Sequence, residues 1–170
     1  MHIRKFIAAS ALAAAALSSA PALAATPTTQ ADGKALILVP LTLTKIDDLD
    51  FGSIIPSAAG GTVTLSPVDG TRTASGVTLV SSDNGNHGYF AGAGSPNQQV
   101  LIALSPPVEL KDAAGDVIPV VGLTLDGPPM RTIDPVSRAF FVGVGGTLTI
   151  KPSQPDGVYS ANFWVTAIYQ

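Results

Sequence analysis

The chain contains few side chains that could perform chemistry. Beyond its first residues it has one histidine, His87, in the segment Asp83-Asn-Gly-Asn-His-Gly-Tyr89, and it has no cysteine. A zinc site needs three or four His, Cys or carboxylate ligands, and a lone histidine among Gly and Asn residues is typical of a solvated loop. We therefore expect no zinc site, and the missing cysteines exclude thiol catalysis and thiolate metal ligands.

Ser95, in Gly92-Ala-Gly-Ser-Pro96, has glycines near it as a catalytic serine often does. A nucleophile elbow requires the pattern Gly-x-Ser-x-Gly on a turn from a strand into a helix, and neither the spacing nor a following helix is present. The glycine cluster Gly143-Val-Gly-Gly146 precedes a predicted strand, whereas a phosphate loop opens a helix. We therefore expect a tight hairpin at the cluster, no cofactor and no enzymatic activity.

Three aspartates, Asp47, Asp48 and Asp50, stand close together before Gly52. The spacing Asp48-x-Asp50-x-Gly52 partly matches an oxygen-rich calcium loop, but no Glu follows where an EF-hand requires one, and Phe51 interrupts the polar face. The alternative is a turn at a strand end, in which Asp side chains bond to the local backbone. The sequence favours the turn and leaves weak calcium binding open.

The elements that position these residues follow an export signal. Arg4 and Lys5 precede an apolar, Ala-rich run over residues 6–17, and the small-residue pattern Ala22-Leu-Ala24 comes after it. This order predicts a secretory signal peptide over residues 1–24, cleaved after Ala24. The alternative is a membrane anchor, but the run is shorter than the roughly 20 residues needed to cross a bilayer. We expect an exported protein of the periplasm, cell surface or extracellular space, with no transmembrane segment in the mature chain.

Charge and length limit the partners and the number of domains. Without the signal the chain has seven basic and twelve acidic residues, a net charge of −5 with His87 neutral, and no basic patch. This balance argues against nucleic acid or an anionic membrane as a partner. Residues 25–34 form a polar tail, and residues 35–170 contain no repeat or linker, so we predict a single domain there.

Short apolar runs separated by Gly, Pro and Asp predict an all-β fold. Two of the runs, Val108–Leu110 and Val117–Val121, flank Ala113-Ala-Gly-Asp116, which is a hairpin signal. No helix is expected beyond the signal peptide, and the many short strands indicate an antiparallel β-sandwich. The other predicted strands are Thr62–Ser66, Val77–Val80, Val100–Leu104, Val121–Leu125, Arg138–Val142 and Thr147–Ile150.

The last predicted strand, Val158–Tyr169, is unusually long and ends at the chain terminus. It has about twelve residues, against the usual five or six, and terminal residues of most domains fray. Gly157 is fourteenth from the end, and Tyr169 is next to last. One face of the strand is apolar and carries Tyr159, Ala161, Phe163, Val165, Ala167 and Tyr169.

The first apolar run, Ala35–Leu43, has two interpretations. It is either the domain's own first strand or a donor strand that completes the sheet of another chain, and the sequence does not decide between them. If its apolar side chains were buried in a neighbour, each would contribute about 1.5–3 kcal/mol, and alanine less. The candidate donor residues are Ala35, Ile37, Val39, Leu41 and Leu43.

The terminal segment resembles the C-terminal signature of chaperone–usher fimbrial subunits. That signature has a glycine fourteenth from the end, alternating apolar residues and a penultimate aromatic residue. The resemblance implies an immunoglobulin-like sandwich that lacks its final strand, which a periplasmic chaperone and then the next subunit supply. The absence of cysteine departs from the commonest of these subunits and fits the alternate class. The implied interface residues are Gly157, Tyr159, Phe163, Val165, Ala167 and Tyr169.

The body of the chain resembles the secreted bacterial β-domains of domain-of-unknown-function family 4402. The matching motifs are Leu49-Asp-Phe-Gly52, Phe141-Val-Gly-Val-Gly-Gly-Thr-Leu148, and Gly157-Val-Tyr-Ser160 leading to Tyr169. The motifs span nearly the whole mature chain, and the family implies fold and export without a mechanism.

Two hypotheses therefore stand beside an enzymatic one that the residues do not support. The first is a structural or adhesive fimbrial-type subunit that polymerises with like subunits by donor-strand exchange. The second is a self-complete, non-enzymatic secreted sandwich that binds an envelope or extracellular partner. The first predicts oligomers, and the second predicts a stable monomer in which Ala35–Leu43 pairs within its own sheet.

Overall fold

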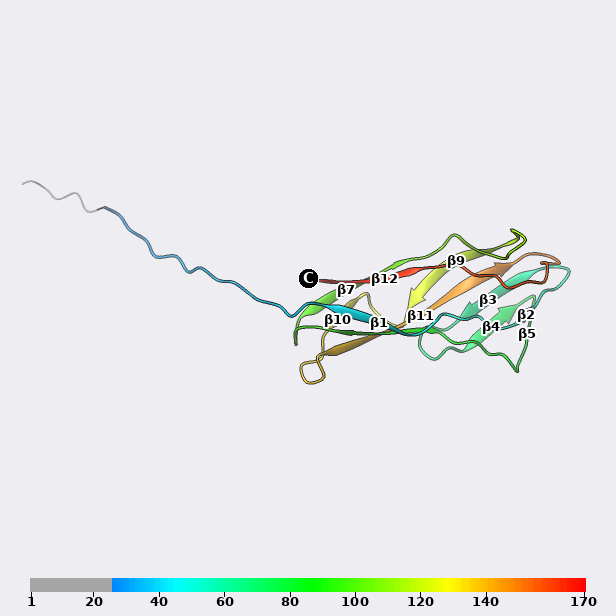
Figure 1. Cartoon of the computed structure of the whole chain (residues 1–170), viewed down its shortest axis with the longest axis horizontal. Helices are drawn as coiled ribbons and strands as arrows, with labels where there is room; N and C mark the ends of the chain where they lie inside the picture. The colour runs from blue at the N-terminus through cyan, green and yellow to red at the C-terminus, as the bar shows by residue number, and fades with distance from the viewer. Residues whose placement is uncertain (1–25) are drawn as a thin grey trace, which may run out of the picture. The chain divides into compact units, whose positions relative to one another are not determined.

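A computed structural model describes residues 26–170 of the chain (Figure 1). The predicted signal peptide, residues 1–24, lies outside the described residues. Residues 26–35 contain no helix or strand and have exposed side chains. Residues 36–170 form one compact unit, and the rest of this description concerns that unit.

The domain is all-β, as the sequence predicts, and every strand pair in it is antiparallel. A seven-stranded sheet has the order β1-β6-β11-β3-β4, with β9 paired to β11 and β8 paired to β9. Its strands are β1 (Thr42–Asp47), β3 (Gly61–Leu65), β4 (Arg72–Ser75), β6 (Gly88–Ala93), β8 (Glu109–Lys111), β9 (Val117–Leu125) and β11 (Ala139–Ile150).

A three-stranded sheet, in the order β10-β7-β12, packs over this one. Its strands are β10 (Met130–Thr132), β7 (Gln99–Ser105) and β12 (Trp164–Tyr169), and a small third sheet pairs β2 (Ile54–Ile55) with β5 (Thr78–Leu79). Successive side chains along a strand point to opposite faces of the sheet, so every second residue faces the space between the two sheets. The result is the antiparallel β-sandwich that was expected.

Two clusters of buried side chains form the core. The first lies between β6, β11 and β7, and includes Phe90, Ile102 and Val142. The second lies farther along the sandwich and includes Leu65, Leu148 and Ile150. The long strand β11 belongs to both clusters, because its first half pairs with β6 and its second half pairs with β3 and β9.

The hairpin predicted at Gly143–Gly146 is wrong, because β11 runs through the cluster without a turn. The glycines instead allow another segment to approach the backbone of β11 closely, because they have no side chain. A Cβ built on Gly145 would lie 2.2 Å from the Leu65 carbonyl oxygen and 2.6 Å from the Pro67 nitrogen. The cluster therefore lets the connection after β3 cross directly over β11.

The strand predicted over Ala35–Leu43 is also displaced, since β1 begins only at Thr42. β1 pairs with β6, and Thr42 is opposite Ala93, the last residue of β6. Within residues 26–170 the residues before Thr42 therefore have no partner strand, and Pro40 among them has no N–H to donate.

The last strand is shorter than the predicted Val158–Tyr169. β12 covers only Trp164–Tyr169, and before it the chain makes a single bridge, between Ser160 and Lys111. Its partner strand β7 ends at Ser105, where two prolines follow, Pro106 and Pro107. Proline cannot donate to a β-ladder, so the pairing stops there.

The hairpin predicted around Ala113–Asp116 is confirmed. It joins β8 to β9, and the Asp112 and Asp116 backbones close it with a hydrogen bond of 3.1 Å. His87 was expected in a solvated loop, but it is half-buried, directly precedes β6 and packs edge-on against Tyr89.

Candidate functional site

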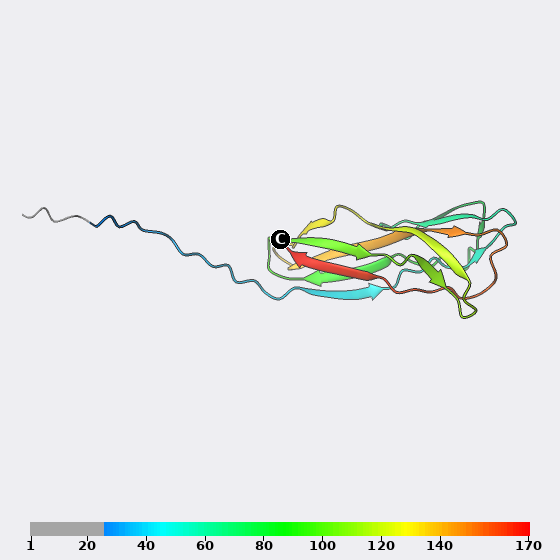
Figure 2. The ribbon, with the colours of Figure 1, turned by 90° about the horizontal axis from the view of Figure 1, so that it is seen from above.

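The last strand, β12, forms one edge of its sheet. It pairs with β7 over Trp164–Tyr169, and no strand of the described chain pairs with its other side. β1 is likewise the outer strand of the facing sheet. In Figure 2 these two edges, β12 in red and β1 in cyan, lie along the same side of the sandwich. We call this side of the sandwich, along the unpaired edges of β12 and β1, the open side.

The register shows which backbone groups of β12 face this open side. The Gln170 N–H donates to the Gln99 carbonyl, so Gln170 is a hydrogen-bonded pair with β7. Antiparallel ladders alternate between bonded and non-bonded pairs, and Thr166 and Ile168 follow the same phase. The N–H and C=O groups of Val165, Ala167 and Tyr169 therefore point away from β7.

The side chains of these outward-bonding residues face the core. Val165, Ala167 and Tyr169, together with Phe163, pack against the first core cluster, yet each stays only half-buried. The Phe163 ring meets the Phe90 ring edge-on, with centroids 6.1 Å apart. The open side thus combines backbone groups that have no partner strand with half-buried apolar side chains.

A small hydrogen-bonded cluster ties the two ends of the domain together. The Tyr169 hydroxyl donates to the Val39 carbonyl at 2.8 Å and accepts from the Ser95 N–H at 2.7 Å. The Val39 N–H in turn donates to the Ser95 hydroxyl oxygen at 2.7 Å. We call Val39, Ser95 and Tyr169 the terminal clasp. Gly94 makes room for it, because a Cβ there would lie 2.3 Å from the Tyr169 hydroxyl.

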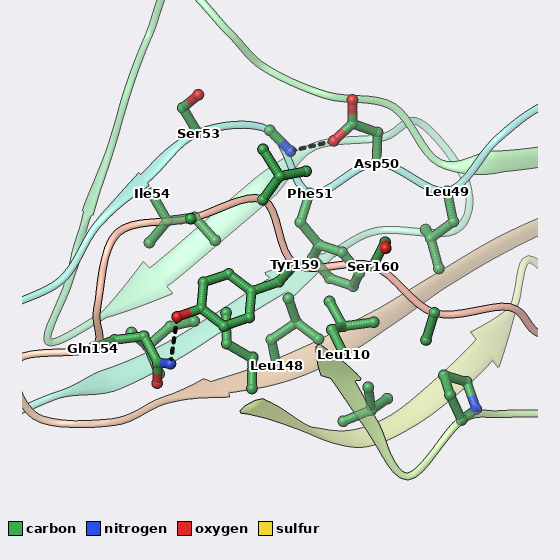
Figure 3. A pocket seen from close by; sticks show the side chains of 18 of the residues that line it. Leu49, Asp50, Phe51, Ser53, Ile54, Leu110, Leu148, Gln154, Tyr159 and Ser160 are labelled. Carbon is green, nitrogen blue, oxygen red and sulfur yellow. Dashed lines mark hydrogen bonds between the residues drawn. The ribbon is translucent and has the colours of Figure 1, made fainter. Parts of the chain in front are cut away.

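Farther along the same side the sandwich contains a hollow of about 620 Å³ (Figure 3). One wall is the segment after β1, with Leu49 and Phe51, and the other is the chain from Gln154 to Phe163. Leu148 and Ile150 of β11, which belong to the second core cluster, contribute to its lining. The hollow therefore lies beside the second core cluster, whose members Leu148 and Ile150 are themselves buried.

Tyr159 and Gln154 hold one wall of the hollow in place (Figure 3). The Gln154 amide nitrogen donates to the Tyr159 hydroxyl at 3.0 Å and to the Val117 carbonyl, and the Tyr159 hydroxyl donates to the Pro155 carbonyl at 2.8 Å. Gln154 is buried, and its carbonyl oxygen has no partner in the described part of the chain. This wall is therefore held by side-chain hydrogen bonds and by a single backbone bridge.

Two of the three aspartates considered for calcium, Asp48 and Asp50, have local partners. The Asp50 carboxylate accepts from the Gly52 N–H at 2.8 Å, as in the predicted turn, and Asp48 pairs with Lys45 at 2.6 Å. The Ser53 hydroxyl donates to Asp83 and is the main cause that lowers the pKa of that carboxyl. Over residues 26–170 no three acidic or histidine side chains gather closely enough to hold a metal ion.

The structure brings together most of the predicted interface residues, although not as one strand. Phe163, Val165, Ala167 and Tyr169 line the first core cluster, Tyr159 belongs to the second, and Gly157 lies in an exposed bend. The predicted donor residues divide as well. Leu41 and Leu43 pack against the domain's own core, while the other three, Ala35, Ile37 and Val39, are exposed.

Sequence reasoning missed the partners of Tyr169. Ser95 was considered only as a nucleophile, and its hydroxyl proves to be a hydrogen-bond acceptor for the backbone of Val39. The signal that could have pointed to this site is Pro40, because a residue before proline is held in an extended conformation.

Comparison with known proteins gives one family. The family model described as "Domain of unknown function (DUF4402)" matches residues 41–169. No curated protein and no solved structure matches the chain significantly. A search of residues 26–170 for a helix able to cross a bilayer finds none.

Proposed function

Because the chain belongs to the domain-of-unknown-function family DUF4402, we propose from its open side that it is an exported, non-catalytic subunit of an extracellular assembly. In this proposal a strand from another chain completes the sheet at β12. The assembly would be of the fimbrial type, in which like subunits are joined by strand exchange.

One observation carries the proposal, namely the coincidence of two properties in β12. The residues whose backbone groups point outward are the same residues whose side chains face the core. An added strand would therefore satisfy the unpaired N–H and C=O groups and cover half-buried apolar side chains in one step, which is the chemistry of β-augmentation. Exposed edges that lack charge or proline are otherwise avoided in proteins.

The chain also carries a segment suited to fill such a site. Leu36 and Ile37 are 72% and 92% exposed, although both are large apolar residues. Each would contribute about 1.5–3 kcal/mol on full burial, and the hollow beside Phe163 has room for more than one such side chain. An exposed apolar segment and an uncovered groove in one chain favour association with like chains.

The proposal can be tested with two variants that damage different halves of the contact. Ile37→Asp places a charge on the candidate donor, at a position so exposed that the domain itself should be unaffected. Ala167→Pro removes one N–H that faces outward from β12, where an edge strand tolerates proline. Each variant of the chain from residue 25 onward should be monomeric by light scattering, whereas the unmodified chain should form a ladder of oligomers.

A mixture of the two variants gives the sharpest result. The Ile37→Asp chain keeps a sound acceptor edge, and the Ala167→Pro chain keeps a sound donor, so the mixture should form a 1:1 complex and grow no further. Thr28→Asp, which makes the same charge change in the exposed tail, is the control and should assemble normally. A mixture that stays monomeric, or an unmodified chain that is a monomer at all concentrations, would contradict the proposal and favour the self-complete sandwich.

A further inference from the structure

The terminal clasp holds both backbone groups of Val39. Its N–H is bonded to Ser95, and its C=O is bonded to Tyr169, whose hydroxyl also binds the Ser95 N–H. Ser95 is 8% exposed, whereas Val39 is 50% exposed, so the contact lies at the surface of the domain with one partner buried. The next residue is Pro40, which restricts Val39 to extended conformations and fixes its own φ.

This arrangement bears on which segment can occupy the open side. Leu41 and Leu43, beyond the clasp, are packed in the domain's own core. They cannot be given to another chain without dismantling β1. The residues available for donation therefore end at Leu38, and the apolar ones among them are Ala35, Leu36, Ile37 and Leu38.

Two sources could supply those residues, namely the same chain or a second copy. β1 starts at Thr42, beside the Tyr169 end of β12. To lie along its own β12, the segment that ends at Leu38 would have to fold back on β1, and the chain would have to reverse direction between Leu38 and Thr42. That reversal passes through Val39 and Pro40, which the clasp and the proline ring keep extended.

We propose that the terminal clasp is a device that directs residues up to Leu38 to a second copy of this chain and prevents the chain from completing its own sheet. The inference rests on the proposed function, since it concerns the occupant of the same edge. It also corrects the predicted donor, Ala35–Leu43, to a segment that ends before the clasp.

The experiment releases the clasp and asks where the segment goes. Tyr169→Phe keeps the ring that packs in the core and removes the hydroxyl, and Pro40→Gly allows a turn. The two are combined in the chain from residue 25 onward. Hydrogen exchange of the Val165, Ala167 and Tyr169 amides reports whether β12 is completed, and light scattering reports whether the species is a monomer.

The unmodified chain should show protected amides in oligomers. The double variant should show protected amides in a monomer. The fraction of monomer should rise about tenfold or more, because the loss of one hydrogen bond changes an equilibrium constant by about that factor. Ser95→Ala with Pro40→Gly releases the clasp from its other side and should give the same result if Tyr169→Phe impairs folding.

The outcomes distinguish the two proposals. Double variants that keep the oligomer distribution of the unmodified chain would overturn the role of the clasp. A protected monomer of the unmodified chain at all concentrations would overturn both proposals, because the chain would then complete itself despite the clasp. Unprotected amides in the unmodified chain at every concentration would instead overturn the proposed function, since β12 would have no occupant at all.

Discussion

Because the β3–β4 connection crosses over β11 at Gly145, we predict that a larger residue at this position destabilises the domain. In Gly145→Ala the new Cβ would lie 2.2 Å from the Leu65 carbonyl oxygen and 2.6 Å from the Pro67 nitrogen, and both are backbone atoms. Neither can rotate away as a side chain would. The contact with Leu65 must open to at least 3.0 Å, the shortest distance that real Cβ atoms keep.

The size of the effect follows from what has to move. Forcing extra volume into a packed core costs about 1–3 kcal/mol and occasionally more. Here the strain falls on the chain beside Leu65, a side chain with no exposed surface, so we expect the upper end of that range, about 3 kcal/mol. For a domain of this size that loss lowers the melting temperature by about 6–12 °C.

Gly122→Ala is the matched control, because Gly122 lies in β9, next to β11, and a Cβ there meets nothing within 4 Å. Where the backbone conformation suits alanine, the change should stabilise the domain by about 0.4–1 kcal/mol. Thermal unfolding followed by circular dichroism compares the two variants. Melting temperatures that fall together, or a Gly145→Ala variant as stable as the parent, would refute the close-approach explanation of the glycine cluster.

Three further predictions concern stability. Arg72 donates to the Phe51 and Val80 carbonyls at 2.7 and 2.8 Å. Arg72→Met should therefore cost about 2–4 kcal/mol in urea unfolding, because both charge-assisted hydrogen bonds are lost; an unchanged midpoint would contradict that role. A hydrogen bond from the Ser66 hydroxyl is the main cause that lowers the pKa of Asp69 to about 2. The stabilisation that the ionised Asp69 gives the folded state is therefore present above about pH 4 and is lost as the pH falls toward 2. Asp69→Asn should flatten this part of the acid-unfolding curve. Phe163→Ala should cost about 1–3 kcal/mol, less than a fully buried phenylalanine; a cost near 5 kcal/mol would mean that the open side is covered.

The fold class and the apolar face of the last strand could be predicted from the sequence because both depend on local alternation. The inward residues Val165, Ala167 and Tyr169 follow the period of two that any strand imposes. The bounds of the strand could not be predicted in this way, because they depend on where β7 ends at Ser105, some sixty residues earlier.

The largest errors in the strand assignment made from the sequence occurred at glycines. The Gly143–Gly146 cluster resembles a turn in the sequence, yet its glycines are needed where a distant segment crosses β11. β6 was missed for the same reason, because Gly88 and Gly92 occupy a strand that pairs on both sides. In a single sequence, a glycine that bends the chain and a glycine that makes room for another segment are identical.

The clasp was beyond local analysis for a different reason. Its members are separated by 56 and 74 positions in the sequence, and the C-terminal signature that contains Tyr169 does not point to Val39 or Ser95. Only the fold of the domain, which brings its first and last residues to the loop after β6, places them in contact.

The long strand β11 has a consequence for how the domain melts. Val142 lies in one buried cluster and Leu148 in the other, six residues along the same uninterrupted backbone. Neither half of the sandwich can lose its packing without disturbing the hydrogen bonds that the other half shares through this strand. The two halves should therefore behave as one cooperative unit, so that truncating either side chain to alanine shifts a single calorimetric peak and never splits it.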